Sequence, residues 1–148
     1  YAKMIDLAHE LFNAGNGGAA VTLGRAYRDG KGVTKNPIES AKYFDMAVNR
    51  NVRWAANELF DVVVANDLQE YDIGKIVNII SILAKSGDIN AMGHMGRAYR
   101  DGKGVEKDLD RAEEWMKKAM NNGSLWAKKE LLGIIEKRNC GNLTSTGN

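Results

Sequence analysis

The chain has 148 residues, of which 44% are hydrophobic and 27% are charged, and its formal net charge at pH 7 is +2. This length and composition predict one ordinary globular domain, and the small net charge argues against nucleic acid or an acidic membrane as the main partner. The sequence has no run of 18 or more apolar residues, which excludes a transmembrane helix. No signal-peptide pattern opens it.

A decapeptide, Gly-Arg-Ala-Tyr-Arg-Asp-Gly-Lys-Gly-Val, occurs at 24–33 and again, unchanged, at 96–105. The offset of 96 − 24 = 72 residues corresponds to two periods of 36. Apolar and small residues follow the same period, at Leu23, Leu59, Met95 and Leu131 and at Ala19, Ala55, Ala91 and Ala127. An internal repeat of this length predicts a solenoid, in which each unit buries its apolar face against the next.

The first predicted elements are a helix over residues 2–13, within a half-unit 2–18, and two helices within a complete unit 19–54. In that unit the apolar spacing around Leu23 and around Phe44 has helical periodicity. Gly30 suits the left-handed position just after a helix, and Pro37 suits a first helical turn. Each unit is therefore expected to contain a helix A, a glycine loop, a helix B and a short return.

The middle unit, 55–90, keeps the period but loses the motif, because Phe60 stands at the position of Gly24 and Val63 at that of Tyr27. Asn66 replaces the first loop glycine and is expected to take the left-handed conformation. The run Val62–Val64 favours a strand by propensity, but its phase with the flanking units predicts helix. The following stretch is apolar nearly all round, which predicts a helix buried on more than one side.

The last complete unit spans 91–126, with Asp108 as the predicted N-cap of its helix B. A half-unit at 127–138 follows, and 141–148 is expected to be a flexible tail. The sequence thus predicts an all-α chain of about eight helices, arranged as a single repeat domain over 1–140. Half-units at both ends suggest a piece excised from a longer chain.

The motif Leu23-Gly24-x-x-Tyr27-x-x-Gly30-x-Gly32-Val33, with its copy from Met95 to Val105, resembles the Sel1-like repeat family. This family is related to tetratricopeptide repeats, whose period is shorter. The resemblance implies a right-handed α-solenoid of antiparallel helix pairs and a role as a scaffold or adaptor for protein–protein interaction. The alternative, which the half-units at both ends favour, is an accessory or regulatory module of a larger enzyme, such as one acting on cell-surface polysaccharide.

No catalytic or metal-binding constellation emerges from the sequence. His9 and His94 lie in different units without a ligand partner at metal spacing, and Cys140 has no partner base near it. The spacing from Gly24 to Lys31 does not match a phosphate-binding loop. We therefore expect no enzymatic activity and no cofactor.

The resemblance implies that helices A line a concave groove, and phase along the repeat then selects the residues that face it. Arginine and tryptophan, which are common at binding hot spots, dominate this set and suggest an acidic protein or peptide partner. The expected groove residues are Arg25, Arg28, Trp54, Asn57, Asp61, Asn90, Arg97, Arg100, Trp126 and Lys129. Alternatively, the arginines belong to the repeat consensus and pair with Asp29 and Asp101.

A second candidate surface is the apolar helix of the middle unit. It either packs within the solenoid or meets another chain or a missing domain, and self-association would use Ile73, Val77, Ile80 and Ile82. The chain lacks the paired cysteines of the secreted, cysteine-rich branch of the family, which favours a cytoplasmic bacterial protein.

Overall fold

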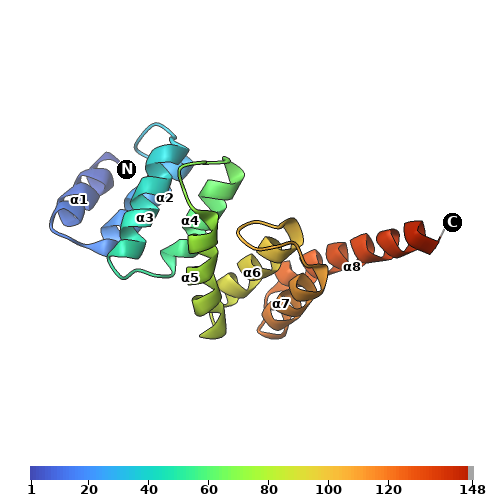
Figure 1. The fold of residues 1–148 in the computed structure, drawn as a ribbon. Coiled ribbons are helices and arrows are strands. Elements are labelled where there is room, and N and C mark those ends of the chain that lie inside the picture. Colours follow the sequence, from blue (N-terminus) through green and yellow to red (C-terminus); the bar gives the residue numbers. More distant parts are fainter. Residues whose placement is uncertain (147–148) are drawn as a thin grey trace. The chain divides into compact units, whose positions relative to one another are not determined.

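The computed structural model describes residues 1–146, and in this part of the chain it contains eight α helices and no strand (Figure 1). The predicted all-α class is therefore confirmed. The helices are α1 (Ala2–Asn13), α2 (Gly17–Asp29), α3 (Pro37–Asn49), α4 (Ala55–Ala65), α5 (Ile73–Lys85), α6 (Ile89–Asp101), α7 (Leu109–Asn121) and α8 (Leu125–Thr146).

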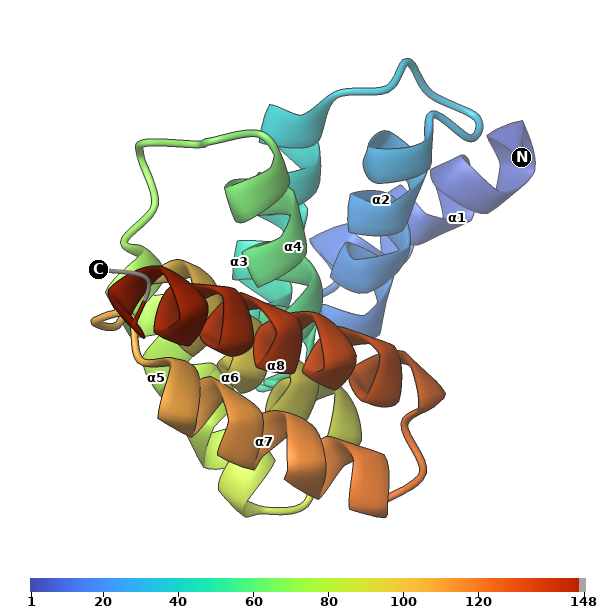
Figure 2. The same cartoon turned by 90° about the vertical axis from the view of Figure 1, so that its right-hand side faces the viewer.

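The chain divides into two compact units, one from Tyr1 to Ile79 and the other beginning at Ile80, so that the division falls inside α5. In the first unit α2 packs against α1 and α3, and α3 packs against α4. In the second unit α7 packs against α6 and runs beside α8 (Figure 2). Helices α2, α4, α6 and α8 correspond to helices A, and α1, α3, α5 and α7 to helices B.

Each copy of the decapeptide contains the C-terminal end of a helix, and the two helices occupy equivalent positions in the repeat. Both α2 and α6 end at a glycine in the left-handed conformation, Gly30 with φ 69° and Gly102 with φ 68°, as the sequence predicts. Only glycine adopts this conformation without a steric penalty from Cβ. The predicted caps of helices B are confirmed as well, since Pro37 opens α3 and the side chain of Asp108 accepts a hydrogen bond from the Arg111 amide at 3.1 Å.

Close packing of helix A on helix B depends on Gly24 and Gly96. A Cβ on Gly24 would lie 2.7 Å from the ring of Phe44, and one on Gly96 would lie 2.7 Å from Cε of Met116. In the first unit the Ser40 hydroxyl also donates to the Gly24 carbonyl at 2.7 Å, across the same contact. The motif glycines therefore serve packing, as expected from the sequence.

In the middle unit, Val62–Val64 lies within α4, so the helical prediction there is confirmed. The prediction for Asn66 is wrong, since its φ is −110° and the positive φ of 49° belongs to Asp67. The reason is local: the Asn66 side-chain amide donates to the Val62 carbonyl at 2.9 Å, and the chain turns one residue later.

At the C-terminal end, α8 continues to Thr146. It therefore runs past residue 138, where the sequence places the end of the helical half-unit, and the boundary predicted there is wrong. Contacts with α7 extend this far along the helix, since Arg138 pairs with Asp110 at 2.8 Å and also with Glu113. Of the predicted tail, residues 147 and 148 lie outside the described part of the chain.

Candidate functional site

The arginines of the first decapeptide meet a carboxylate from the next helix A. Arg25 Nε on α2 donates to Glu58 Oε2 on α4 at 3.0 Å, and Arg28 Nη1 donates to the same oxygen at 3.2 Å. Arg28 also donates two hydrogen bonds to the carboxylate of its neighbour Asp29, of 2.9 and 3.0 Å. The Glu58 side chain is only 17% exposed, whereas that of Arg25 is 50% exposed.

Trp54 completes this group of residues, which we call the first cluster (Arg25, Arg28, Asp29, Trp54 and Glu58). It directly precedes α4, and the guanidinium carbon of Arg25 lies 5.7 Å from the centre of its ring. The tryptophan is 45% exposed. An ordered, half-exposed ring beside an arginine is a surface that a partner can cover.

The second unit contains the equivalent residues 72 positions later, and we call them the second cluster (Arg97, Arg100, Asp101, Trp126 and Glu130). Arg100 donates to both oxygens of Asp101, at 3.0 and 3.1 Å, and pairs with Glu130 on α8. Trp126 is again 45% exposed, and its ring lies on the backbone of α6, where a Cβ on Gly93 would be 2.7 Å from Cζ3. Arg97 is partly exposed.

These ion pairs fix the charge states of the clusters. The hydrogen bonds from Arg28 hold the pKa of Asp29 below its usual range, and those from Arg100 do the same for the pKa of Asp101. The hydrogen bond to Asp29 also raises the pKa of Arg28. The alternative that the sequence suggested, pairing of the arginines with Asp29 and Asp101, is therefore present, with Glu58 and Glu130 added to it.

The remaining predicted groove residues separate into exposed and buried positions. Asn90 and Lys129 are exposed. Asp61 is partly buried and lines a depression of about 300 Å³ in the first unit, together with Arg28. The prediction for Asn57 is wrong: it is 6% exposed, and its buried Oδ1 has no hydrogen-bond partner within the part of the chain that the structure describes.

Glu58 and Glu130 are the cluster residues that sequence reasoning missed. Both stand on a helix A, and their offset of 130 − 58 = 72 residues is that of the decapeptide. The signal was therefore present in the sequence as a repeated acidic residue, but only the contacts of Glu58 with Arg25 and Arg28, and of Glu130 with Arg100, show that these residues face the arginines.

The apolar helix α5 does not present the four residues predicted for self-association as one surface. Val77 is 3% exposed and Ile80 is fully buried, so both belong to the core of the chain. Ile82 is 51% exposed, and Ile73 is partly exposed. The prediction that this helix packs within the fold accounts for the buried pair.

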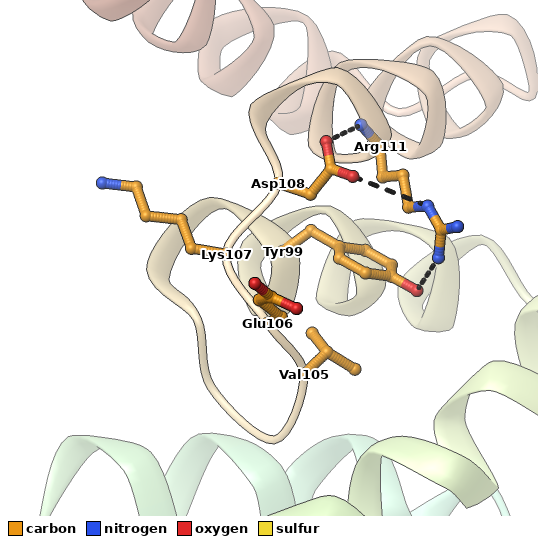
Figure 3. A pocket seen from close by; sticks show the side chains of 6 residues that line it. All are labelled: Tyr99, Val105, Glu106, Lys107, Asp108 and Arg111. Atoms are coloured by element: carbon orange, nitrogen blue, oxygen red, sulfur yellow. Dashed lines mark hydrogen bonds and ion pairs between the residues drawn. The ribbon is translucent and has the colours of Figure 1, made fainter.

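Another depression, of about 460 Å³, lies beside the second decapeptide (Figure 3). In it Arg111 lies between two partners, with Nη1 donating to the Tyr99 hydroxyl at 3.3 Å and Nε 3.6 Å from Asp108 Oδ2. Sequence reasoning singled out neither Tyr99 nor Arg111 for binding.

The described residues form neither a candidate metal site nor a candidate membrane span. They contain no group of three or more histidine, cysteine, aspartate or glutamate side chains that could hold a metal ion. Among them there is also no helix with both the length and the apolar character that crossing a membrane requires.

Comparison with known proteins identifies the repeat. Residues 19–52 and 89–124 match the Sel1 repeat family. A Sel1 repeat protein from Oxalobacter formigenes is similar in structure, with a TM-score of 0.68 and 25% identity over 90% of this chain and 54% of that one. A protective antigen present in uropathogenic Escherichia coli strains, which displays an SLR fold, gives a TM-score of 0.74 and 25% identity over 90% of this chain and 28% of that one. The present chain thus spans about half or less of these proteins.

Proposed function

We propose that this chain, whose residues 19–52 and 89–124 match the Sel1 repeat family, is a non-catalytic scaffold that binds a segment of a partner protein on its helix-A surfaces. Sel1 repeat proteins are generally scaffolds for protein interaction. The finer proposal is that the first and second clusters are the binding positions, one in each compact unit.

The repeated, half-exposed tryptophan is the observation that carries this proposal. Trp54 and Trp126 occupy equivalent positions, and each is 45% exposed. Trp54 lies beside the ion-paired Arg25, and Trp126 lies against Gly93 of α6. Tryptophan and arginine are the residues over-represented at hot spots, where a partner excludes water from a large ring. The ordered ion pairs keep the surface around each ring in one conformation, which lowers the entropy lost on binding.

The first cluster also has hydrogen-bonding capacity left for an acidic partner. Arg25 uses Nε and Nη2 for Glu58, and its Nη1 group makes no hydrogen bond to any residue that the structure describes. A carboxylate of the partner can accept from Nη1 without displacing Glu58, because guanidinium has five donor hydrogens in one plane. The proposed ligand is therefore a peptide segment with an acidic residue next to an apolar one that covers Trp54.

Selection of displayed peptides on the immobilised chain tests the proposal, because such a selection requires no identified partner. We expect a random dodecapeptide library to yield sequences that combine acidic and apolar residues. These peptides should bind the Trp54→Ala/Trp126→Ala variant at least roughly tenfold more weakly than the parent, the loss typical of a truncated hot spot.

The matched control is the exposed pair Leu7→Ala and Leu132→Ala, which removes apolar side chains outside both clusters. It should leave peptide binding unchanged. Selected peptides that bind the tryptophan variant as tightly as the parent would show that the clusters are not the binding positions. Failure to enrich any peptide would argue against a peptide-binding scaffold.

A further inference from the structure

A pocket of about 350 Å³ lies among α5, α6 and α7 of the second unit, and we call it the B-face pocket. The residues that carry the argument are Ser81 and Lys85 on α5, Tyr99 on α6, and Arg111, Trp115 and Lys118 on α7. None of these residues belongs to the second cluster, so the B-face pocket is separate from the surface discussed above.

The first unit shows what normally fills this position. There the rings of Tyr27 and Tyr43 stack, with centroids 5.6 Å apart and planes 7° from parallel. From α1, His9 and Phe12 bring ring edges to Tyr43, with centroids 6.2 and 5.2 Å away.

Seventy-two residues later, serine and alanine replace two of these four rings. Ser81 stands at the position of His9, and Ala84 at that of Phe12. Tyr99 and Trp115 remain as the counterparts of Tyr27 and Tyr43. The first compact unit thus fills this position with packed aromatic rings, whereas the second has a pocket with aromatic walls there.

The charged residues around this position also differ between the two compact units. Lys85, Arg111 and Lys118 stand where the first unit has Asn13, Glu39 and Met46. One carboxylate, Glu114, also lines the pocket, so three cationic groups face one anionic group.

Two of the three cations lie against the aromatic walls. Lys118 Nζ lies 4.6 Å from the centre of the Trp115 ring, and the guanidinium carbon of Arg111 lies 5.6 Å from that of Tyr99. Within the part of the chain that the structure describes, neither Lys85 nor Lys118 makes an ion pair. Lys85 and Lys118 are therefore not neutralised within the described residues, and Arg111, which pairs with Asp108 through Nε and donates to Tyr99 through Nη1, keeps its Nη2 group for a ligand.

The spacing on α7 defines the ligand further. Arg111, Trp115 and Lys118 are at i, i+4 and i+7, and so share one face of the helix, with the two cations about 10 Å apart along its axis. In a peptide of polyproline II conformation, which has three residues per turn and a rise of about 3.1 Å per residue, side chains three residues apart lie on the same side and are separated by about the same distance. Two acidic residues with two residues between them would therefore place one carboxylate at each cation, with the intervening segment passing over Trp115.

We propose that the B-face pocket binds an acidic peptide with the pattern acidic-x-x-acidic, in which at least one intervening residue is apolar. A nucleic acid fits this surface less well. The adjoining depression, which shares Tyr99 and Arg111, is lined by the carboxylates of Glu106 and Asp108 (Figure 3), and these would repel a continuous phosphate backbone.

Fluorescence of Trp115 provides the test, because the chain has three tryptophans and the other two can be replaced by Trp54→Phe and Trp126→Phe. The probe is acetyl-Gly-Glu-Ala-Leu-Glu-Gly-amide. We expect it to change the emission of Trp115 with a saturable titration curve. The peptide with both glutamates replaced by glutamine should give no saturable change, and the peptide with adjacent glutamates, Gly-Glu-Glu-Ala-Leu-Gly, should bind several-fold more weakly.

The first unit supplies the matched variant. Lys85→Asn, Arg111→Glu and Lys118→Met together introduce its residues at the equivalent positions, and should weaken binding of the probe roughly tenfold or more. The control triple, Lys3→Asn, Arg53→Glu and Lys42→Met, changes the net charge equally at exposed sites of the first unit and should bind as the parent does. Thermal melts followed by circular dichroism establish that both triples are folded.

Several outcomes would overturn the proposal. These are equal binding of the glutamine peptide, unchanged binding by the folded Lys85/Arg111/Lys118 triple, or tighter binding of hexathymidylate than of the glutamate peptide, which would indicate a phosphate site. The background of this experiment already lacks Trp54 and Trp126, so its result does not depend on whether the two clusters bind a partner.

Discussion

Glu58 on α4 accepts a 3.0 Å hydrogen bond from Nε of Arg25 on α2, and this contact joins two successive helices A through residues 33 positions apart in the chain. A charge-reversal test of groove binding at Arg25, Arg28, Arg97 and Arg100 would disturb the fold, because it would place new carboxylates beside Glu58 and Glu130. Binding is therefore better tested at the tryptophans, and the ion pairs are better tested by stability.

The ion pair between Arg25 and Glu58 should contribute a favourable coupling energy to the stability of the protein. In a double-mutant cycle of Arg25→Ala and Glu58→Ala, we expect a coupling energy of about 0.5–1 kcal/mol, reduced by the half-exposure of Arg25. Urea denaturation followed by circular dichroism measures it, and 1 M NaCl should lower it. A coupling energy near zero at low salt would mean that the pair contributes no stability.

Insertion of a methyl group at the two motif glycines should have unequal effects. Gly24→Ala is expected to destabilise the chain by roughly 1–3 kcal/mol, because the added Cβ would meet the rigid ring of Phe44. Gly96→Ala should destabilise less, because the atoms that its Cβ would meet belong to the flexible Met116 side chain. Thermal melts of the two variants provide the comparison, and a larger loss for Gly96→Ala would contradict this explanation.

Two aspartates should show opposite dependences of stability on pH. Burial raises the pKa of Asp45, so its contribution to stability is fully present below the usual aspartate range and is lost as the pH rises through its folded pKa. The hydrogen bonds from Arg28 lower the pKa of Asp29, so its contribution is present above the usual range and is lost as the pH falls through its lower folded pKa.

Accordingly, Asp45→Asn should raise the melting temperature relative to the parent at pH 7 and lose this advantage near pH 3. Asp29→Asn should lower the melting temperature at pH 7, and the difference should shrink as the pH falls. Melts at pH 3, 5 and 7 test both changes in one series. The same sign for both variants at pH 7 would be inconsistent with the environments described.

The buried Oδ1 of Asn57 has no hydrogen-bond partner among the described residues. We therefore expect replacement of Asn57 by an apolar residue to stabilise the protein. Asn57→Val introduces the residue found at the equivalent position of α2, Val21, and removes the buried Oδ1. We expect a gain of about 1 kcal/mol in the free energy of unfolding, measured by urea denaturation. Asn90→Val, at an exposed position, serves as the control and should change stability little.

The sequence predicted the helices because several separate features of the repeat indicate where each helix begins and ends. The period, the glycines after α2 and α6, and the caps at Pro37 and Asp108 all indicate the same boundaries. Where a single local signal was used, the prediction was less reliable: Asn66 was given the left-handed conformation that belongs to Asp67, and α8 passes the boundary expected at residue 138.

The candidate site was less predictable because it depends on contacts between neighbouring repeats. Phase alone selected Arg25 and Trp54 as surface residues, but it also selected Asn57, which packing buries. Glu58 lay outside the selection, since no pattern within one unit indicates which acidic residue reaches the preceding helix A. Groove binding, an acidic partner and a cytoplasmic location stay predictions.

The contact of Glu58 with α2 determines where these repeats can be cut for transfer to another protein. A graft cut at the 36-residue period, such as residues 19–54, would include Arg25 and Arg28 but leave behind the carboxylate that holds them. Two exposed guanidinium groups without that counter-ion would then remain on the graft. The smallest transferable cassette therefore extends through the following helix A, and a chimaera assembled from such overlapping pieces should keep the arginines in their native rotamers.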